Sequence, residues 1–187
     1  MCIRDSFEDP SNLYRSLEHY RTSFKSHTEA MWVSKLGLRQ SAPGDDELVA
    51  QLVSLLRVVE TDMTIFFRSL GTIDGLNPLD MAHAYYDEAA LPVDELGLWL
   101  GKWWSRVDGD PDREAMNNAN PKYVLRNWMS QLAIEAAEAD DYSVAIELQD
   151  LLRAPYEEQP SSQDRWYKKR PEWARHKVGC SMLSCSS

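Results

Sequence analysis

The chain is poor in cysteine and has no long apolar run. Its three cysteines, Cys2, Cys180 and Cys185, lie near the two ends of 187 residues, an arrangement unlike a disulfide scaffold. A reducing compartment is therefore expected. No apolar segment approaches the roughly 20 residues that span a bilayer, and no signal peptide is visible. We expect neither secretion nor a membrane partner.

Recognisable catalytic and nucleotide-binding motifs are also missing. The glycine pairs at 71/75 and 97/101 do not form the closely spaced turn of a phosphate-binding loop. The four histidines are scattered singly, and no serine or cysteine nucleophile stands in a recognisable motif. A kinase-like catalytic loop and an Asp-Phe-Gly element are absent. We therefore assign no catalytic, cofactor-binding or metal-binding residue.

The residues that are present have a globular composition, with 43% hydrophobic residues and seven tryptophans, enough for one domain. The net charge of −10 is uneven. Residues 165–177 hold six Lys or Arg and one acid, a charge of +5, which leaves −15 on the rest. This acidic body argues against a nucleic-acid partner, since phosphates require a wide positive surface. We expect this basic segment to dock on the acidic body, with an anionic partner as the alternative.

Helical spacing of apolar residues dominates the chain, and no stretch alternates long enough to predict a strand, so the expected fold class is all-α. A proline-, serine- and charge-rich stretch, 156–170, is expected to be an extended strap pinned by Trp166, Tyr167 and Trp173. Helices are predicted at 12–36 (ending at Gly37), 48–59, 62–70, from Asn77-Pro78, at 92–107, after 112, at 120–138 and from 141 to Pro155, the last two forming a hairpin.

The clearest predicted helix start is at residues 120–128, which read NPKYVLRNW. Asn120 is a favourable N-cap, and Pro121 at the first helical position loses no hydrogen bond. The apolar residues that follow share one face of the predicted helix: Val124, Leu125, Trp128, Leu132 and Ala136.

Two patterns superficially suggest metal ligands. Asp80, His83 and Asp87 share a helical face, as in the carboxylate-x-x-His pairs of di-iron bundles, but the second pair that such bundles need is missing. Residues 108–112 (DGDPD) resemble the start of a calcium loop, but the bidentate glutamate does not follow. We therefore assign no metal to the first pattern and interpret the second as a turn that leads into another helix.

Three further features favour structural over functional roles. His27 lies on the apolar stripe of 12–36 and is read as an interior or boundary histidine, since no second ligand is nearby. Arg68 among apolar neighbours could anchor a carboxylate ligand, but a structural ion pair is favoured. The aromatic stripe of 92–107 is read as core, because its acidic neighbours disfavour base stacking.

A resemblance to a known family extends this reading. The segments that carry it are NPKYVLRNW at 120–128, IEAAE at 134–138, LLR with Pro155-Tyr156, PEWA at 171–174 and the terminal SCSS, with TDMT at 61–64 and Phe67-Arg68 upstream. In this order they resemble the C-terminal region of the selenoprotein O family. Residues 1–6 look like a non-native head, and the match covers nearly everything after them.

The resemblance implies a kinase-like protein adenylyltransferase that moves AMP from ATP to Ser, Thr or Tyr of target proteins with Mg²⁺. Its nucleotide-binding and catalytic residues lie upstream, so ATP and Mg²⁺ would bind outside this chain. Expected partners are that upstream portion and protein substrates. The compartment would be cytoplasmic in bacteria and mitochondrial in eukaryotes. The alternative is a free-standing helical interaction module whose basic segment binds an acidic partner.

The same resemblance implies one functional position in this chain. The family carries a redox-active cysteine or selenocysteine third from the end, which Cys185 matches. Its implied partner is a cysteine of the upstream catalytic part. Cys180 is a weaker second candidate, and a Cys180–Cys185 pair would close a very short loop. The predicted organisation is a head at 1–6, a helical region at 7–155, and a strap with a redox tail at 156–187.

Overall fold

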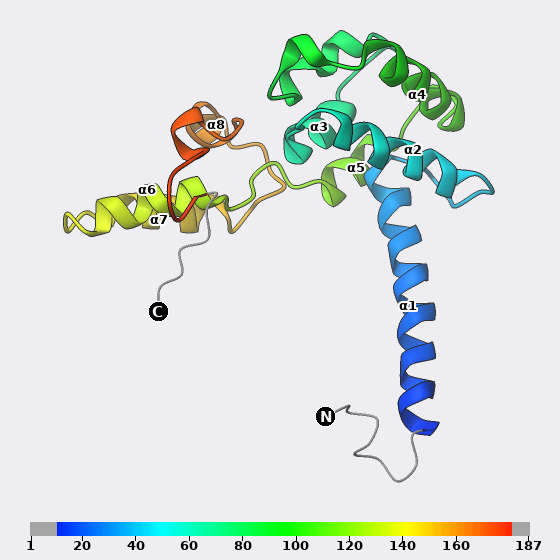
Figure 1. Cartoon of the computed structure of the whole chain (residues 1–187), viewed down its shortest axis with the longest axis horizontal. Helices are drawn as coiled ribbons and strands as arrows, with labels where there is room; N and C mark the ends of the chain where they lie inside the picture. Colours follow the sequence, from blue (N-terminus) through cyan, green and yellow to red (C-terminus); the bar gives the residue numbers. More distant parts are fainter. Residues whose placement is uncertain (1–10, 181–187) are drawn as a thin grey trace.

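The computed structural model describes residues 11–180, and this part of the chain is helical (Figure 1). Its one β pairing is an isolated antiparallel bridge between Thr61 and Tyr85, so the all-α prediction is confirmed. The elements are α1 (Ser11–Lys35), α2 (Asp45–Val58), α3 (Met63–Leu70), η2 (Pro78–Ala84), η3 (Glu88–Ala90), α4 (Val93–Arg106), α5 (Arg113–Ala119), α6 (Asn127–Ala137), α7 (Ser143–Leu151), α8 (Pro160–Trp166) and η4 (Glu172–Ala174).

The first hydrophobic core lies among α2, α3, α4, η2 and the end of α1, and its members run from Leu36 to Met116. Trp99 and Trp103 of α4 stack in its centre with ring planes 5° apart. Each indole N–H donates to a backbone carbonyl, Trp99 to Leu48 at 2.9 Å and Trp103 to Leu36 at 2.8 Å. These bonds satisfy the buried indole donors. The aromatic stripe of α4 is therefore core, as predicted.

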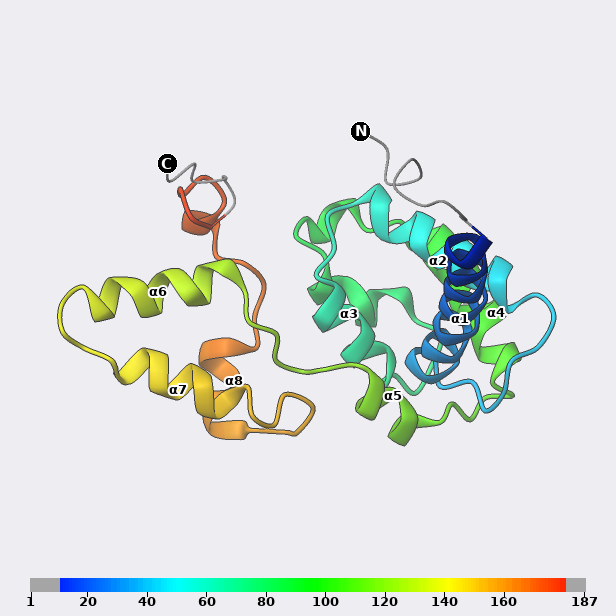
Figure 2. The same cartoon turned by 90° about the horizontal axis from the view of Figure 1, so that it is seen from below.

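A second core is built from α6, α7 and α8 (Figure 2). Helices α6 and α7 pack as the predicted hairpin, and Asp141 accepts a hydrogen bond from the amide of Ser143 at the start of α7. Trp128 of α6 stacks on Trp166 of α8 with centroids 5.8 Å apart. The chain therefore forms two packed groups of helices, α1–α5 and α6–α8.

Helix α1 projects from the first group (Figure 1). It ends as predicted, with Gly37 at φ 66°. The amides of Gly37 and Leu38 donate to Ser34 and Val33 in the Schellman pattern. No residue of α1 itself is buried. His27 is exposed and bonds the carbonyl of Ser23, so the prediction of an interior or boundary histidine was wrong, because no residue between 11 and 180 covers this face.

The predicted helix start at 120 was also wrong. Asn120 follows α5 as its C-cap, and α6 begins only at Asn127. Backbone amides of Lys122 and Tyr123 both donate to the carbonyl of Pro155, at 2.8 and 3.0 Å, and this pairing holds the segment extended. A contact with a distant part of the chain therefore overrides the local cap signal.

The strap at 156–170 is not wholly extended. Pro160 begins the seven-residue helix α8, at the first-turn position that proline favours. Trp166 at its end is buried and donates through Nε1 to Glu147 at 2.7 Å. Burial of this side chain makes the turn of helix favourable despite the proline, serine and charge content.

Several local predictions are confirmed. Asp62 caps α3 by accepting from the amide of Ile65 at 3.1 Å. Asn77 caps the amide of Leu79 at 3.2 Å, although η2 is a 3₁₀-helix. Residues 108–112 form a turn, with positive φ at 108 and 109.

Candidate functional site: the docked C-terminal segment

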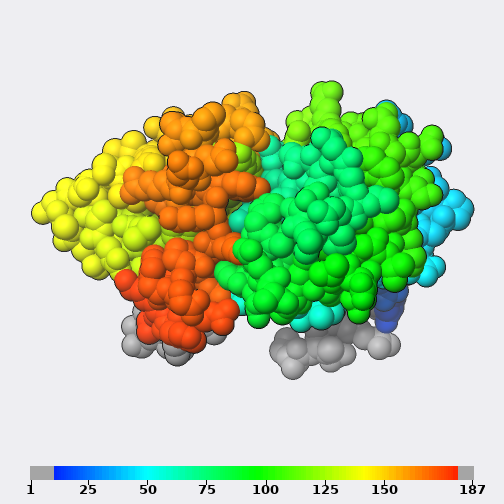
Figure 3. All heavy atoms as spheres, turned by 90° about the horizontal axis from the view of Figure 1, so that it is seen from above, coloured from blue at the N-terminus to red at the C-terminus, as the bar shows by residue number. Residues whose placement is uncertain are grey.

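The basic segment, residues 165–177, lies against both groups of helices (Figure 3). On the first group, Lys169 Nζ donates to the carbonyl of Tyr85 at 2.6 Å and to Glu88 at 3.0 Å. Arg170 and Arg175 both donate to Glu60, at 2.8 and 2.5 Å. Glu60, between α2 and α3, therefore holds two cations of one segment.

On the second group the same segment pairs with two other acids. Arg165 donates to Glu147 of α7, and Lys177 donates to Glu135 of α6. The hydrogen bond from Lys177 lowers the pKa of Glu135. The prediction that the basic segment docks on the acidic body of its own chain is thus confirmed.

A buried charge network connects the two groups beneath this segment. Arg68 of α3 and Lys122 have side chains 8% and 7% exposed, and both donate to Glu158. Arg68 also donates to the backbone carbonyls of Asn117, Asn120 and Tyr156. Because a buried cation requires partners on every side, this set fixes the loop after α7 to α3. The structural ion pair predicted for Arg68 is confirmed.

Sequence reasoning missed the other members of the network. Lys122 falls within the predicted helix at 120–138, and Glu158 falls within the predicted strap at 156–170. The hydrogen bond from Lys122 is the first cause that lowers the pKa of Glu158. A lysine directly after Asn-Pro carries no local sign of burial, so only a three-dimensional arrangement could have identified it.

A second ion pair links the same two groups of helices. With the network around Arg68, Lys122 and Glu158 it forms the junction between the groups. Arg126, just before α6, makes a bidentate contact with Asp62, whose side chain is 3% exposed. Asp62 also caps α3, so one carboxylate orders the start of α3 and holds the start of α6. Each member of this pair depends on the other, because removing one partner of a buried ion pair leaves an uncompensated buried charge.

The described residues end beside α6. Cys180 has a free thiol, is 5% exposed and belongs to the second core. Its backbone carbonyl accepts a hydrogen bond from Asn127 Nδ2 at 2.9 Å, which ties it to the first turn of α6. Cys185 lies outside the described residues. The redox roles of Cys185 and Cys180 stay predictions.

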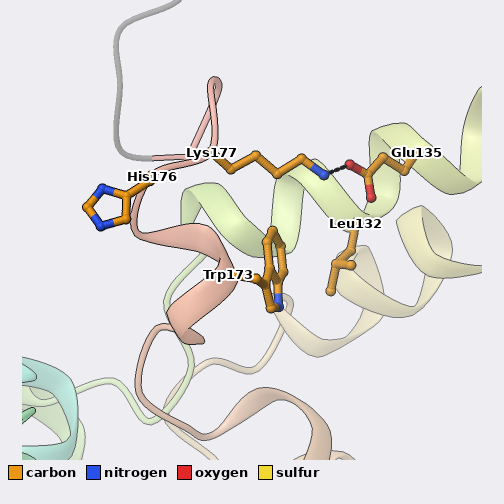
Figure 4. Close-up of a pocket in the computed structure, with 5 residues that line it drawn as sticks. All are labelled: Leu132, Glu135, Trp173, His176 and Lys177. Carbon is orange, nitrogen blue, oxygen red and sulfur yellow. Dashed lines mark hydrogen bonds and ion pairs between the residues drawn. The ribbon is translucent and has the colours of Figure 1, made fainter.

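A shallow, open pocket of about 490 Å³ adjoins this end of the segment (Figure 4). Lys177 reaches across to Glu135, with Leu132 and Trp173 beneath the pair, while His176 points away. Trp173 stays 45% exposed with Lys177 5.3 Å from its ring. Of the three aromatics expected to pin the strap, Trp166 is the buried one.

A cleft of about 690 Å³ lies between α1 and the start of α2, with mainly apolar walls around Trp32. One basic residue, Lys25, lines it, against the acids Glu29, Asp45 and Asp46. Binding the phosphates of a nucleoside triphosphate requires several positively charged or N–H donor groups. The cleft therefore suits an apolar group better than a nucleotide.

The residues suspected as metal ligands do not gather. His83 Nε2 bonds Ser69 Oγ at 2.7 Å, Asp80 bonds Asn77, and Asp87 caps Ala89. Between residues 11 and 180, no three His, Cys, Asp or Glu side chains are arranged to hold a metal ion. We therefore assign neither magnesium nor a nucleotide to residues of the described part. The described helices also include none long and apolar enough to cross a membrane.

Comparison with known proteins defines the class. The chain is 42% identical to a protein nucleotidyltransferase YdiU of Flavobacterium johnsoniae over 96% of its own length and 37% of the relative's. It is 42% identical to the relative of the same name from Rhodopirellula baltica, over 94% and 37%, and 41% identical to that of Aromatoleum aromaticum, over 94% and 35%. The relatives are nucleotidyltransferases, and the chain spans just over a third of their length.

The family description "Protein adenylyltransferase SelO" matches residues 4–153. The chain belongs to this SelO family. The match includes the junction residues Arg68, Lys122 and Arg126 and stops before the basic segment.

Proposed function

We propose that this chain is the C-terminal portion of a protein adenylyltransferase, and that it is inactive alone. The whole enzyme would transfer AMP from ATP to Ser, Thr or Tyr hydroxyls of target proteins with Mg²⁺ bound upstream, in a kinase-like portion. The single observation that carries the proposal is the partial match, which covers 96% of this chain and 37% of a named nucleotidyltransferase.

The chemistry sets what the missing portion must supply. A substrate hydroxyl oxygen attacks the α-phosphorus of ATP, the bond from that phosphorus to the bridging oxygen of pyrophosphate breaks, and the hydroxyl proton is lost. Stabilising the charge in such a transfer requires metal and cationic side chains around the phosphates. The Arg and Lys residues of the junction are already committed to Glu158, Asp62 and backbone carbonyls.

The test uses labelled ATP. The purified chain should transfer no AMP to itself or to a mixture of proteins, whereas the full-length enzyme, expressed from the extended reading frame, should transfer it in a Mg²⁺-dependent way. Robust transfer by the chain alone would show that the catalytic groups are within it. A full-length product that transfers nothing, beside an active relative as positive control, would argue against the activity.

The alternative, a free-standing module whose basic segment captures an acidic partner, receives less support. Five cations of the segment already contact acids of the same chain: Arg165, Lys169, Arg170, Arg175 and Lys177. A partner would have to displace these contacts. The docked segment is better explained as a structural closure of the two helical groups.

A further inference from the structure

Helix α1 carries a large apolar surface that the described chain leaves uncovered. Leu17, Tyr20, Phe24 and Met31 are 46, 63, 59 and 45% exposed, and none of the residues of the helix is buried. Tyr20 and Phe24 stack on each other, 5.9 Å between centroids. In proteins most of the stability of a helix comes from tertiary packing of its apolar face. This surface is suited to contact with something else.

The spacing of the stripe indicates what kind of surface would cover it. Its residues stand at positions 13, 17, 20, 24, 27 and 31, with steps of four and three in strict alternation. That 3.5-residue repeat is the a/d pattern of a helix that packs along another helix, with knobs entering holes. The occupant should therefore be a helix lying along α1.

The edges of the stripe argue against a second copy of this chain. One edge holds the small residues Ser16, Ser23 and Ala30 at seven-residue intervals, and the other holds Tyr14, Arg21 and Thr28. In a self-paired coiled coil these edges would face each other, and complementary charges there set the choice of partner. Neither edge offers an acid to Arg21, in either relative direction.

We propose that the apolar stripe of α1, residues 13–31, packs against a helix of the upstream portion of the same protein. The occupant would bring an acidic residue to the side of Arg21, which in this structure pairs with the exposed Glu18 at 3.7 Å. It would place large side chains over the small edge formed by Ser16, Ser23 and Ala30. The proposal rests on the proposed function, because the chain covers 37% of its relatives' length and the remainder supplies the occupant.

Hydrogen exchange tests this packing. The amides of residues 17–31 should exchange at least about 100-fold more slowly in the full-length enzyme than in this chain alone, because packing suppresses local opening. In the full-length enzyme, Phe24→Asp should remove most of that protection. The matched control His19→Asp, which places the same charge on the opposite, solvated side of the helix, should leave it unchanged.

Any of the following results would overturn the proposed packing of α1. Equal exchange in the chain and the full-length enzyme would do so, as would equal loss of protection in the two variants. A chain that sediments as a dimer with α1 protected would assign the stripe to a second copy. A gene without upstream coding sequence would remove the occupant altogether.

The same samples separate this inference from the proposed function. AMP transfer is measured on the full-length enzyme used for exchange. Transfer with an unprotected α1 would refute the packing and leave the function standing. Protection of α1 without AMP transfer would refute the proposed function and leave the packing standing.

Discussion

Asn120 and Lys35 exchange two hydrogen bonds: Asn120 Nδ2 donates to the carbonyl of Lys35 at 3.0 Å, and Lys35 Nζ donates to Asn120 Oδ1 at 2.6 Å. Asn120 is 2% exposed, and partial burial of the Lys35 ammonium group lowers its pKa. The last turn of α1 is thereby fastened to the end of α5. One amide side chain satisfies both the ammonium group and an orphan carbonyl of a helix end.

Removing this pair should destabilise the first group of helices. Asn120→Ala leaves the ammonium group and carbonyl of Lys35 short of partners, at a cost of about 2–4 kcal/mol in the free energy of unfolding. Urea denaturation followed by tryptophan fluorescence measures it. Asn118→Ala, the same change at an exposed position of α5, should cost under about 0.5 kcal/mol. Equal losses would contradict the assigned role.

The pairing of Glu158 predicts an acid-dependent loss of stability. Its folded-state pKa lies below the ordinary 4.5, first because of the hydrogen bond from Lys122. The stabilisation is therefore complete above that ordinary value and is lost as the pH falls through the lower, folded-state pKa. Glu158→Gln should cost about 1 kcal/mol at pH 7, since solvent screens this exposed carboxylate, and flatten the acid limb. Glu157→Gln, its exposed neighbour, should change neither.

Alanine substitutions at two glycines with positive φ distinguish the cost of backbone strain from the cost of a steric clash. A Cβ at Gly37 (φ 66°) would lie 2.8 Å from Met116 Sδ and 3.0 Å from the amide nitrogen of Asp112, whereas at Gly44 (φ 94°) it would meet nothing within 4 Å. Both alanine variants should lose about 1–2 kcal/mol to the left-handed conformation. Gly37→Ala should lose clearly more, measured as the difference in unfolding free energy. A larger loss for Gly44→Ala would contradict the packing.

Release of the basic segment should follow the loss of Glu60. Two arginines pair with this carboxylate, each exposed pair contributing about 0.2–1 kcal/mol. Glu60→Ala should therefore raise tryptic cleavage within residues 165–177 by about 2- to 10-fold, as should high salt in the unmodified chain. Glu95→Ala, at an exposed position of α4, should cleave like the parent. An unchanged pattern in Glu60→Ala would show that other contacts hold the segment.

The tail cysteines are distinguished by oxidation of the full-length enzyme. We expect Cys185→Ser to abolish an oxidant-dependent shift in gel mobility and Cys180→Ser to retain it. Burial of Cys180 at 5% exposure limits oxidant access to its thiol. If the shift persists in Cys185→Ser, the redox role assigned to that residue is wrong.

Local signals predicted the fold wherever a helix follows its own periodicity. The stripe of α4 and the caps Asp62 and Asn77 were read correctly, because a capping side chain bonds two or three residues ahead. The start of α6 was misread because Pro155, some thirty residues away, takes the amides of Lys122 and Tyr123. Asn-Pro is identical at 77 and 120, so only tertiary contacts distinguish the two.

The docking of the basic segment was predictable from the distribution of charge along the sequence, but the individual ion-pair partners were not. An excess of +5 on 165–177 predicted docking on an acidic body. Charge counts do not reveal that Glu60 receives Arg170 and Arg175, which are 110 and 115 residues away. Helix α1 shows a converse limit: its period was correct, but periodicity does not reveal whether a face is covered.

The bonds from Lys122 and Tyr123 to Pro155 also bring together the segment that enters α6 and the segment that leaves α7. The α6–α7 hairpin is therefore a loop of chain whose two ends meet at one place. We therefore expect a change of length at the turn between the two helices to affect the hairpin alone. A tag inserted at that turn would therefore leave α3, the junction and the basic segment in place.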